Sequence, residues 1–187
     1  MVDVVFAATK DVEAADEEMD AEDIEKVSKS THSINKTPST VINAVRGQII
    51  EAISKQREEV LIKKTRSMYW SSDHTTRVIC TVSKRYENKG SGKYWYAYHP
   101  QWAEFLQEGT HAFLALGCVD RKIAFLLPLE KVKEVLPKLN TTVKEDGSVY
   151  WHLKITEPQP GSYHLQIPSG DQDLPLSEYV LSVEKRS

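Results

Sequence analysis

The chain has 187 residues, of which 40% are hydrophobic and 27% charged, and its formal net charge is −3. These values suit one globular domain with a full core. No apolar run reaches the roughly 18 residues that a membrane-spanning helix needs, which excludes an integral helical membrane protein. The acidic start of the chain lacks the basic region of a signal peptide. We therefore expect a cytoplasmic protein in which Cys80 and Cys118 are buried thiols without a disulfide.

The charge is unevenly distributed along the chain. Residues 1–30 hold ten acids and three lysines, whereas residues 46–99 hold eleven Lys or Arg against five Asp or Glu. Residues 1–38 have little apolar surface, and Pro38 stops any helix before it. We predict an acidic arm and linker over 1–38. It is either a solvated tail or a segment that contacts a protein partner or the basic face of its own domain.

Regular structure is expected from residue 39 onward. An apolar stripe within 41–53 predicts a helix that is capped by Ser39 or Thr40 and ends near Glu59. Three β-prone runs come next along the chain, at 60–70, 76–86 and 93–99. The Gly- and Asn-rich loop before the last run predicts a hairpin.

The second half of the chain continues with helices and strands. A short helix is expected to start at Pro100, which suits the first helical turn. Two apolar strands flank residues 119–122, and a helix follows over 128–140. The remaining strands follow an Asp146-Gly147 turn or lie within 162–168 and 179–185.

The order of these elements predicts the fold class. Strands follow one another through short loops, and the β–α–β alternation of a parallel sheet is missing. We therefore predict one α+β domain over 39–187, with a mainly antiparallel sheet and helices packed on it.

Signatures of the common catalytic classes are missing from the sequence. The chain has no Gly-rich phosphate loop, no Cys-x-x-Cys pair and no His-Glu-x-x-His pair. His99 and His152 each follow an aromatic run at the end of a strand. They are either histidines at the edge of the core or candidates for catalysis and ligand binding.

A metal-dependent nuclease needs an acid on one strand and an acid-x-Lys motif on the next, so that the acids hold Mg²⁺. Asp120 and Lys122 have the spacing of that motif but fall in an expected hairpin turn. Asp73 precedes the strand that carries Lys84, but Val82 stands where the motif has its acid. These matches make Asp73, Asp120 and Lys122 the catalytic candidates if the protein is a nuclease with Mg²⁺ as cofactor.

Residues 82–100 interleave aromatic and basic side chains around a polar loop. Rings stack on bases and cations neutralise phosphates, so the pattern indicates nucleic-acid binding. Alternation puts the three tyrosines of 94–98 on one face and Trp95 on the other, and one of these faces must be core. The alternative is an ordinary core strand whose cations discourage edge pairing. The predicted nucleic-acid-binding residues are Lys84, Arg85, Lys89, Lys93, Trp95 and Tyr96.

Several segments within residues 65–156 carry a resemblance. VSKRY, YWYAYHP, LGCVD, LNTT and YWH together resemble the signature of a prokaryotic protein family with no assigned activity. The segments AFLLPLEKV and YWHLKI also resemble sheet-helix portions of restriction-endonuclease-like proteins. This resemblance implies a prokaryotic setting in DNA processing or defence.

We therefore predict a nucleic-acid-binding domain of a prokaryotic DNA-processing or defence system, with DNA or RNA as its partner. Three other functions stay open. A sensor of a small molecule or modified nucleotide would line a pocket with the aromatic residues. A degenerate metal-dependent nuclease would bring two carboxylates together, and a protein-interaction module would use the acidic arm.

Overall fold

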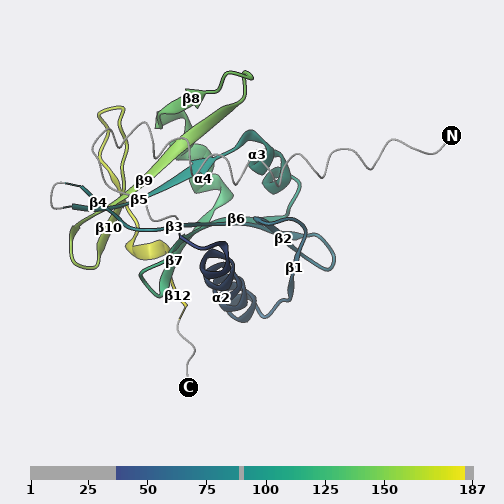
Figure 1. The fold of residues 1–187 in the computed structure, drawn as a ribbon. Helices are drawn as coiled ribbons and strands as arrows, with labels where there is room; N and C mark the ends of the chain where they lie inside the picture. The colour runs from purple at the N-terminus through teal and green to yellow at the C-terminus, as the bar shows by residue number, and fades with distance from the viewer. Residues whose placement is uncertain (1–36, 89–90, 184–187) are drawn as a thin grey trace. The chain divides into compact units, whose positions relative to one another are not determined.

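The computed structural model describes residues 37–88 and 91–183, and its strands form two sheets (Figure 1). In spatial order, the first sheet contains β1 (Leu61–Lys63), β2 (Met68–Ser71), β3 (Thr76–Ser83), β6 (His111–Cys118), β7 (Ile123–Pro128) and β12 (Val180–Ser182). The second sheet contains β11 (Leu174–Pro175), β10 (Ser162–Leu165), β9 (Val149–Gln159), β5 (Ser91–Tyr98) and β4 (Tyr86–Asn88), with β8 (Thr141–Val143) paired to β9. Except for its last two residues, the predicted arm over 1–38 lies outside the described residues.

Among the described strands, every pair is antiparallel except β3 with β6, which run parallel. The predicted α+β class and mainly antiparallel pairing are therefore confirmed. The strands divide between two sheets, however, where the sequence predicted one.

The helices of the described residues are α2 (Ser39–Arg57), α3 (Pro100–Gln107), α4 (Leu129–Val135) and the short 3-10 turns η1 (Leu136–Lys138) and η2 (Ser177–Tyr179). None of these helices is both long and apolar enough to cross a membrane. The predicted side-chain cap of α2 is wrong, because Pro38 occupies the N-cap position and no side chain bonds the first turn. The carbonyl of Pro38 instead accepts bonds from the amides of Val41 and Ile42.

Two of the predicted strands are each interrupted. The run 60–70 splits into β1 and β2 around a turn in which the Lys64 amide bonds the Met68 carbonyl. The run 76–86 splits after Ser83, where the chain leaves the first sheet and enters the second as β4. Ser83 connects the two sheets at this corner. Its hydroxyl accepts a hydrogen bond from the Trp95 amide of β5 (3.1 Å), and its carbonyl accepts one from the Val119 amide next to β6 (3.0 Å).

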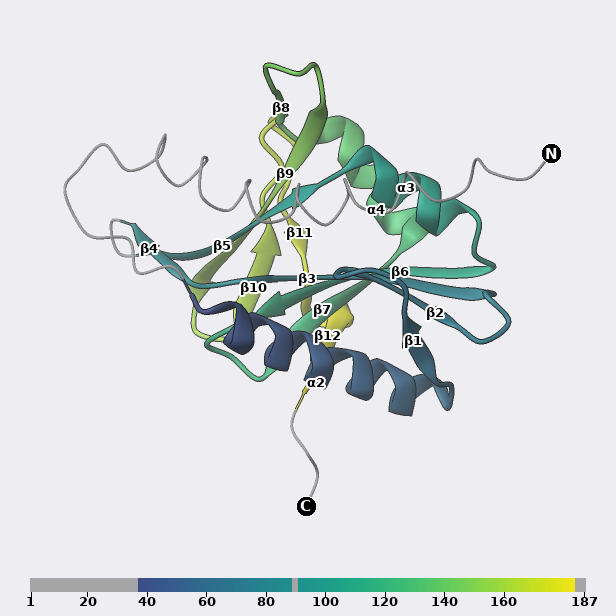
Figure 2. The same cartoon turned by 45° about the vertical axis from the view of Figure 1, so that its right-hand side comes forward.

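One face of the first sheet packs against α2 (Figure 2). Ile49, Ile50 and Ile53 of the helix share a buried cluster with β3 and β6 residues such as Cys80. Gly117 lets the helix come this close, because a Cβ atom there would lie 2.4 Å from the Cδ1 atom of Ile49. A larger residue at this point would require the end of the Ile49 side chain to move.

Both cysteines are buried and free, as predicted. Burial raises the pKa of the Cys80 thiol and of the Cys118 thiol to about 12. The reactive thiolate form is therefore scarce at neutral pH, and both residues act as small core side chains.

The tyrosine face of β5 points toward the first sheet and is core. Tyr94, Tyr96 and Tyr98 are at most 2% exposed. The Tyr96 hydroxyl donates to the carbonyl of Gly117 on β6 (2.9 Å), whereas the buried Tyr98 hydroxyl has no hydrogen-bond partner among the described residues. Burial of the Tyr96 hydroxyl is thus compensated by a hydrogen bond within the protein, whereas burial of the Tyr98 hydroxyl is not.

This difference predicts opposite outcomes for two matched substitutions. Tyr96→Phe removes a buried hydrogen bond and leaves the Gly117 carbonyl without it, so it should lower the free energy of unfolding by about 1–2 kcal/mol. Tyr98→Phe removes only an uncompensated hydroxyl and should leave stability unchanged or raised. Urea unfolding of both variants measures the difference, and equal losses would contradict the hydrogen-bond assignment.

Candidate nucleic-acid interface

The other face of β5 and β9 turns away from the first sheet and carries Trp95. The strand register places Trp95 directly opposite Lys154, and Lys93 lies two residues before it on the same face. Side chains directly opposite one another in an antiparallel pair have Cβ atoms about 5 Å apart. All three side chains are half-buried. An indole ring on an accessible surface therefore has one lysine beside it on its own strand and another on the paired strand.

Neither lysine of this face is neutralised within the described part of the chain. Lys93 and Lys154 have no carboxylate within ion-pair distance there. The described strands of the second sheet carry two carboxylates, Glu87 and Glu157, and both are ion-paired to Arg85. The outward face thus has a local excess of positive charge.

The face continues onto β4. Tyr86 lies opposite Lys93, and the ammonium group of Lys84 lies 5.2 Å from the centre of the Tyr86 ring. Lys89, which the sequence also assigned to this surface, lies outside the described residues. The structure therefore brings Lys84, Lys93 and Trp95 of the predicted set to one surface.

His152 belongs to the same face and fixes the orientation of Trp95. The indole N–H of Trp95 donates to Nδ1 of His152 (3.0 Å), and Nε2 of His152 lies 2.7 Å from the Thr142 hydroxyl. An indole nitrogen can only donate, so Nδ1 accepts and the neutral ring carries its proton on Nε2. Nε2–H then donates to Thr142.

This tautomer argues against catalysis by His152. A histidine that activates a hydroxyl nucleophile must accept its proton, and the third group of such a triad accepts a bond from the histidine. Here Trp95 donates to the ring instead, and the nitrogen facing Thr142 already bears the proton. The arrangement holds the indole in place and provides no general base.

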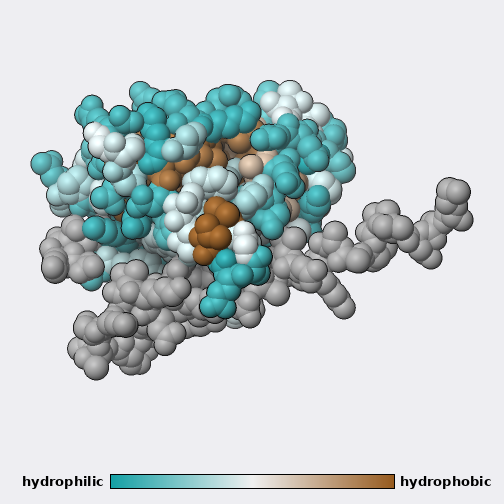
Figure 3. Space-filling model, turned by 90° about the horizontal axis from the view of Figure 1, so that it is seen from above, coloured by the Kyte–Doolittle hydropathy of each residue, from teal (hydrophilic) through white to brown (hydrophobic). Residues whose placement is uncertain are grey.

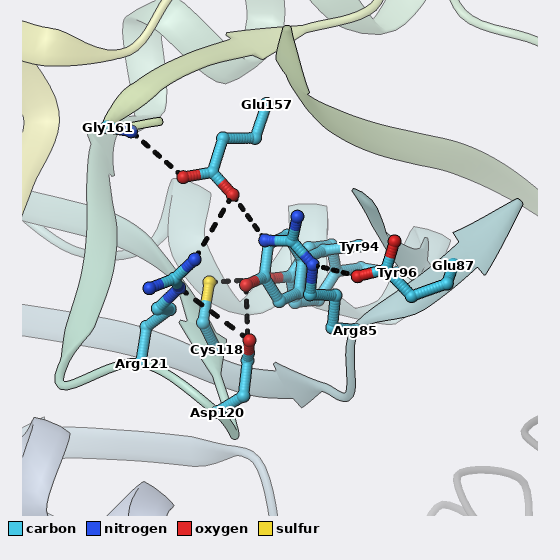
Figure 4. A network of polar contacts seen from close by, with 9 residues as sticks. All are labelled: Arg85, Glu87, Tyr94, Tyr96, Cys118, Asp120, Arg121, Glu157 and Gly161. Atoms are coloured by element: carbon cyan, nitrogen blue, oxygen red, sulfur yellow. Dashed lines mark hydrogen bonds and ion pairs between the residues drawn. The ribbon is translucent and has the colours of Figure 1, made fainter. Parts of the chain in front are cut away.

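A polar network lies at the junction of the two sheets (Figure 4). Its centre is Glu157 on β9, whose side chain is only 4% exposed. The carboxylate accepts the Gly161 amide (2.9 Å), is ion-paired to Arg85, and lies 3.5 Å from Arg121. Asp120 is joined to the same region, because it accepts a bond from the Tyr94 hydroxyl (2.8 Å).

The network lowers the pKa of Glu157 even though burial alone would raise it. The opposing causes are the bonds from the Gly161 amide, Arg85 and Tyr163, together with the charge of Arg121. Glu157 is therefore ionised at neutral pH and neutralises the two arginines.

Two of the predicted nucleic-acid-binding residues need correction. Arg85 is committed to Glu157 and Glu87, and its side chain is only 22% exposed. It is therefore part of the structural network and is not available to phosphate. Tyr96 is buried with its hydroxyl bonded to β6, so its ring cannot stack on a base.

The nuclease candidates do not form one site. Asp73 lies in the turn before β3, and Asp120 lies in the turn after β6. Because β3 and β6 are parallel and eight residues long in register, these turns are about 23 Å apart. Lys122 lies in the same turn as Asp120. Among the described residues, no three His, Cys, Asp or Glu side chains are grouped for metal binding.

Asp73 has a structural role in its own turn. Its carboxylate accepts bonds from the Ser71 hydroxyl (2.6 Å) and from the amide and hydroxyl of Thr75 (3.1 and 2.8 Å). The Ser71 hydroxyl contributes most, and together these bonds lower the pKa of Asp73 to about 2.

His99 lies between β5 and α3, at the N-cap position of the helix. Its ring packs edge-on against Trp102, with ring centres 4.9 Å apart, and lies 6.2 Å from the Tyr150 ring. His152 lies 5.1 Å from the same Tyr150 ring. The two histidines therefore flank one tyrosine.

A small hollow lies away from the aromatic face. Its volume is about 260 Å³, and it is lined by Glu134, Val135, Lys138, Ile167, Gln172, Asp173, Leu174 and Pro175. None of the predicted site residues lines it, so it does not correspond to the aromatic pocket of the sensor alternative.

The face seen from above is mainly hydrophilic, with hydrophobic side chains reaching it in few places (Figure 3).

Comparison of the chain with protein-family models, with curated proteins and with solved structures finds no match. The resemblance to a prokaryotic family and to restriction-endonuclease-like proteins therefore stays a prediction.

The sequence reasoning missed Lys154 and Glu157. Strand alternation contains a signal for both, because Leu153 and Ile155 mark the buried face of β9. Lys154 lies between them and must face outward, whereas Glu157 continues the buried positions. A carboxylate at a buried position indicates a cationic partner elsewhere in the fold.

The Glu157 network predicts a measurable loss of stability. Glu157→Gln removes the charge that neutralises two arginines, and Arg85 keeps only Glu87, so unfolding should become easier by about 2 kcal/mol. The control is Glu134→Gln, which breaks an exposed pair with Lys131 and should change stability far less, because solvent screens such pairs. Urea unfolding compares the two variants.

The same residue predicts a pH dependence. The pKa of Glu157 is lower in the folded state, so its stabilising contribution is present above the ordinary glutamate value of about 4.3. The contribution is lost as pH falls from that value toward the folded-state pKa. Glu157→Gln should therefore weaken the loss of stability at acid pH. If stability depended on pH in the same way in the variant, ionisation of Glu157 would not contribute to the stability of the fold.

Proposed function

We propose that the domain binds single-stranded nucleic acid on the outward face of its second sheet. The observation that supports this most is the position of Trp95 next to both Lys93 and Lys154, two lysines without a carboxylate partner in the described part of the chain. The indole would stack on a base, and the two lysines would contact phosphates on either side.

The arrangement favours a single strand over a duplex. A base can stack on a protein ring only when it is unstacked from its neighbours, which single strands allow. His152 supports this role because its bond to the indole N–H holds the ring in one orientation before any ligand arrives. Such preorganisation lowers the entropy cost of binding.

The chemistry of the face favours binding over catalysis. His152 carries its proton on the nitrogen that faces Thr142, and Asp73 and Asp120 lie at opposite ends of a parallel strand pair. A place in DNA processing or defence remains part of the proposal through the resemblance described above.

A salt titration tests the contribution of the two lysines. Each phosphate contact on a single strand contributes about 0.7 to the slope of log affinity against log salt. Lys93→Gln with Lys154→Gln should therefore weaken binding to labelled oligothymidylate and oligouridylate, and reduce the slope by about 1.4. The matched control is Lys55→Gln with Lys133→Gln, which changes the same charge on α2 and α4.

The ring is tested by Trp95→Leu, which keeps apolar volume but removes the stacking surface. It should cost about 1–3 kcal/mol of binding free energy at every salt concentration. Wild-type binding that is absent at low salt would overturn the proposal. Equal slopes in the lysine variant and its control would also remove this face as the site.

A further inference from the structure

A second group of aromatic and cationic side chains lies in the first sheet, around the end of β2 and the turn that joins it to β3. The rings of Trp70 and His74 are stacked there, with centres 3.8 Å apart and planes inclined by 20°. Trp70 is half-buried and His74 is exposed. No other ring of the described residues contacts the second face of the His74 imidazole.

The backbone of the turn holds His74 over the indole. His74 has a φ of 61°, in the left-handed region that residues other than glycine rarely adopt. Its amide donates to the Ser71 carbonyl (2.9 Å), and the Asp73 carboxylate bonds Ser71 and Thr75 on either side of it. The imidazole is thus presented by a closed, hydrogen-bonded turn.

Two cations lie over the Trp70 ring of this stack. The ammonium group of Lys64 lies 4.5 Å from the centre of the Trp70 ring and 5.2 Å from that of Phe105. Within the described residues, Lys64 has no carboxylate at ion-pair distance. Arg77 also lies over the Trp70 ring (5.6 Å) but is neutralised by Glu108.

We propose that the Trp70–His74 stack is a second base-binding platform. A nucleobase stacks on the open face of His74 and extends the existing pair of rings by one layer, while Lys64 attracts a flanking phosphate. Histidine rings serve as stacking partners for unpaired bases as other aromatic rings do. Lys64, which has no carboxylate partner in the described part of the chain, supplies the electrostatic attraction that such platforms need.

This platform shares its ligand class with the proposed function but depends on different residues. Trp95 bonds Ser83 at one end of β3, whereas Trp70 on β2 and His74 in the following turn lie near Thr76 at the other end. Either site can therefore fail without the other.

The experiment follows the indole N–H signals of the ¹⁵N-labelled full chain by NMR during titration with a short oligoadenylate. The four tryptophans are assigned by single Trp→Phe substitutions. The Trp70 signal should shift in the wild type and equally in Trp95→Leu. The signal of the buried Trp102 serves as the reference that should not move.

His74→Asn tests the ring itself, because asparagine accepts the left-handed backbone but offers no stacking surface. The dissociation constant reported by the Trp70 signal should rise about tenfold. Ser72→Ala, an exposed change in the same turn, should leave it unaltered. Thermal unfolding of both variants confirms that the turn is intact.

Two outcomes would overturn the platform. One is a Trp70 signal that stays fixed while the Trp95 signal saturates. The other is an unchanged dissociation constant in His74→Asn. A Trp70 shift without any Trp95 shift would support this platform and reject the second sheet as the binding face.

Discussion

The burial of the Glu157 carboxylate is the constraint on which the junction of the two sheets depends. Burying a lone carboxylate costs several kcal/mol, so the fold has to bring partners to it. Those partners come from three separate places: the corner at Arg85, the β6–β7 turn at Arg121 and the β9–β10 turn at Gly161. A single charge therefore fixes segments from both sheets at one point.

The same junction explains how charge is distributed over the second sheet. Glu87 and Glu157 are the two carboxylates on the described strands of the second sheet. Both are ion-paired to Arg85 at the junction. The lysines beside Trp95 are left without acids of their own. The sequence shows a mixture of cations over residues 82–100, and the fold separates it into a structural arginine and outward-facing lysines.

Much of the fold could be read from local patterns. The apolar stripe predicts α2, the two apolar runs around 119–122 predict the β6–β7 hairpin, and alternation correctly divides Tyr94, Tyr96 and Tyr98 from Trp95. The division into two sheets could not be read in this way, because the run 76–86 is β-prone throughout. The chain turns at Ser83 because partners from distant strands satisfy its hydroxyl and carbonyl.

The candidate site was predictable to a similar degree. Lys84, Lys93 and Trp95 could be named because they lie within one short stretch. Glu157 and Arg85 are 72 positions apart, and their pairing has no local signal. The stack of His74 on Trp70 depends on a left-handed backbone that composition does not reveal for histidine.

The path of the chain between the sheets has a consequence for cooperativity. Within the described residues, the chain passes from one sheet to the other four times, after β3, β5, β7 and β11. Neither sheet is therefore built from one continuous segment of the chain. Each crossing connects a strand of one sheet to a strand of the other. We therefore expect the two sheets to unfold together in a single step, and we expect that cutting the chain between them would not give autonomously folding pieces.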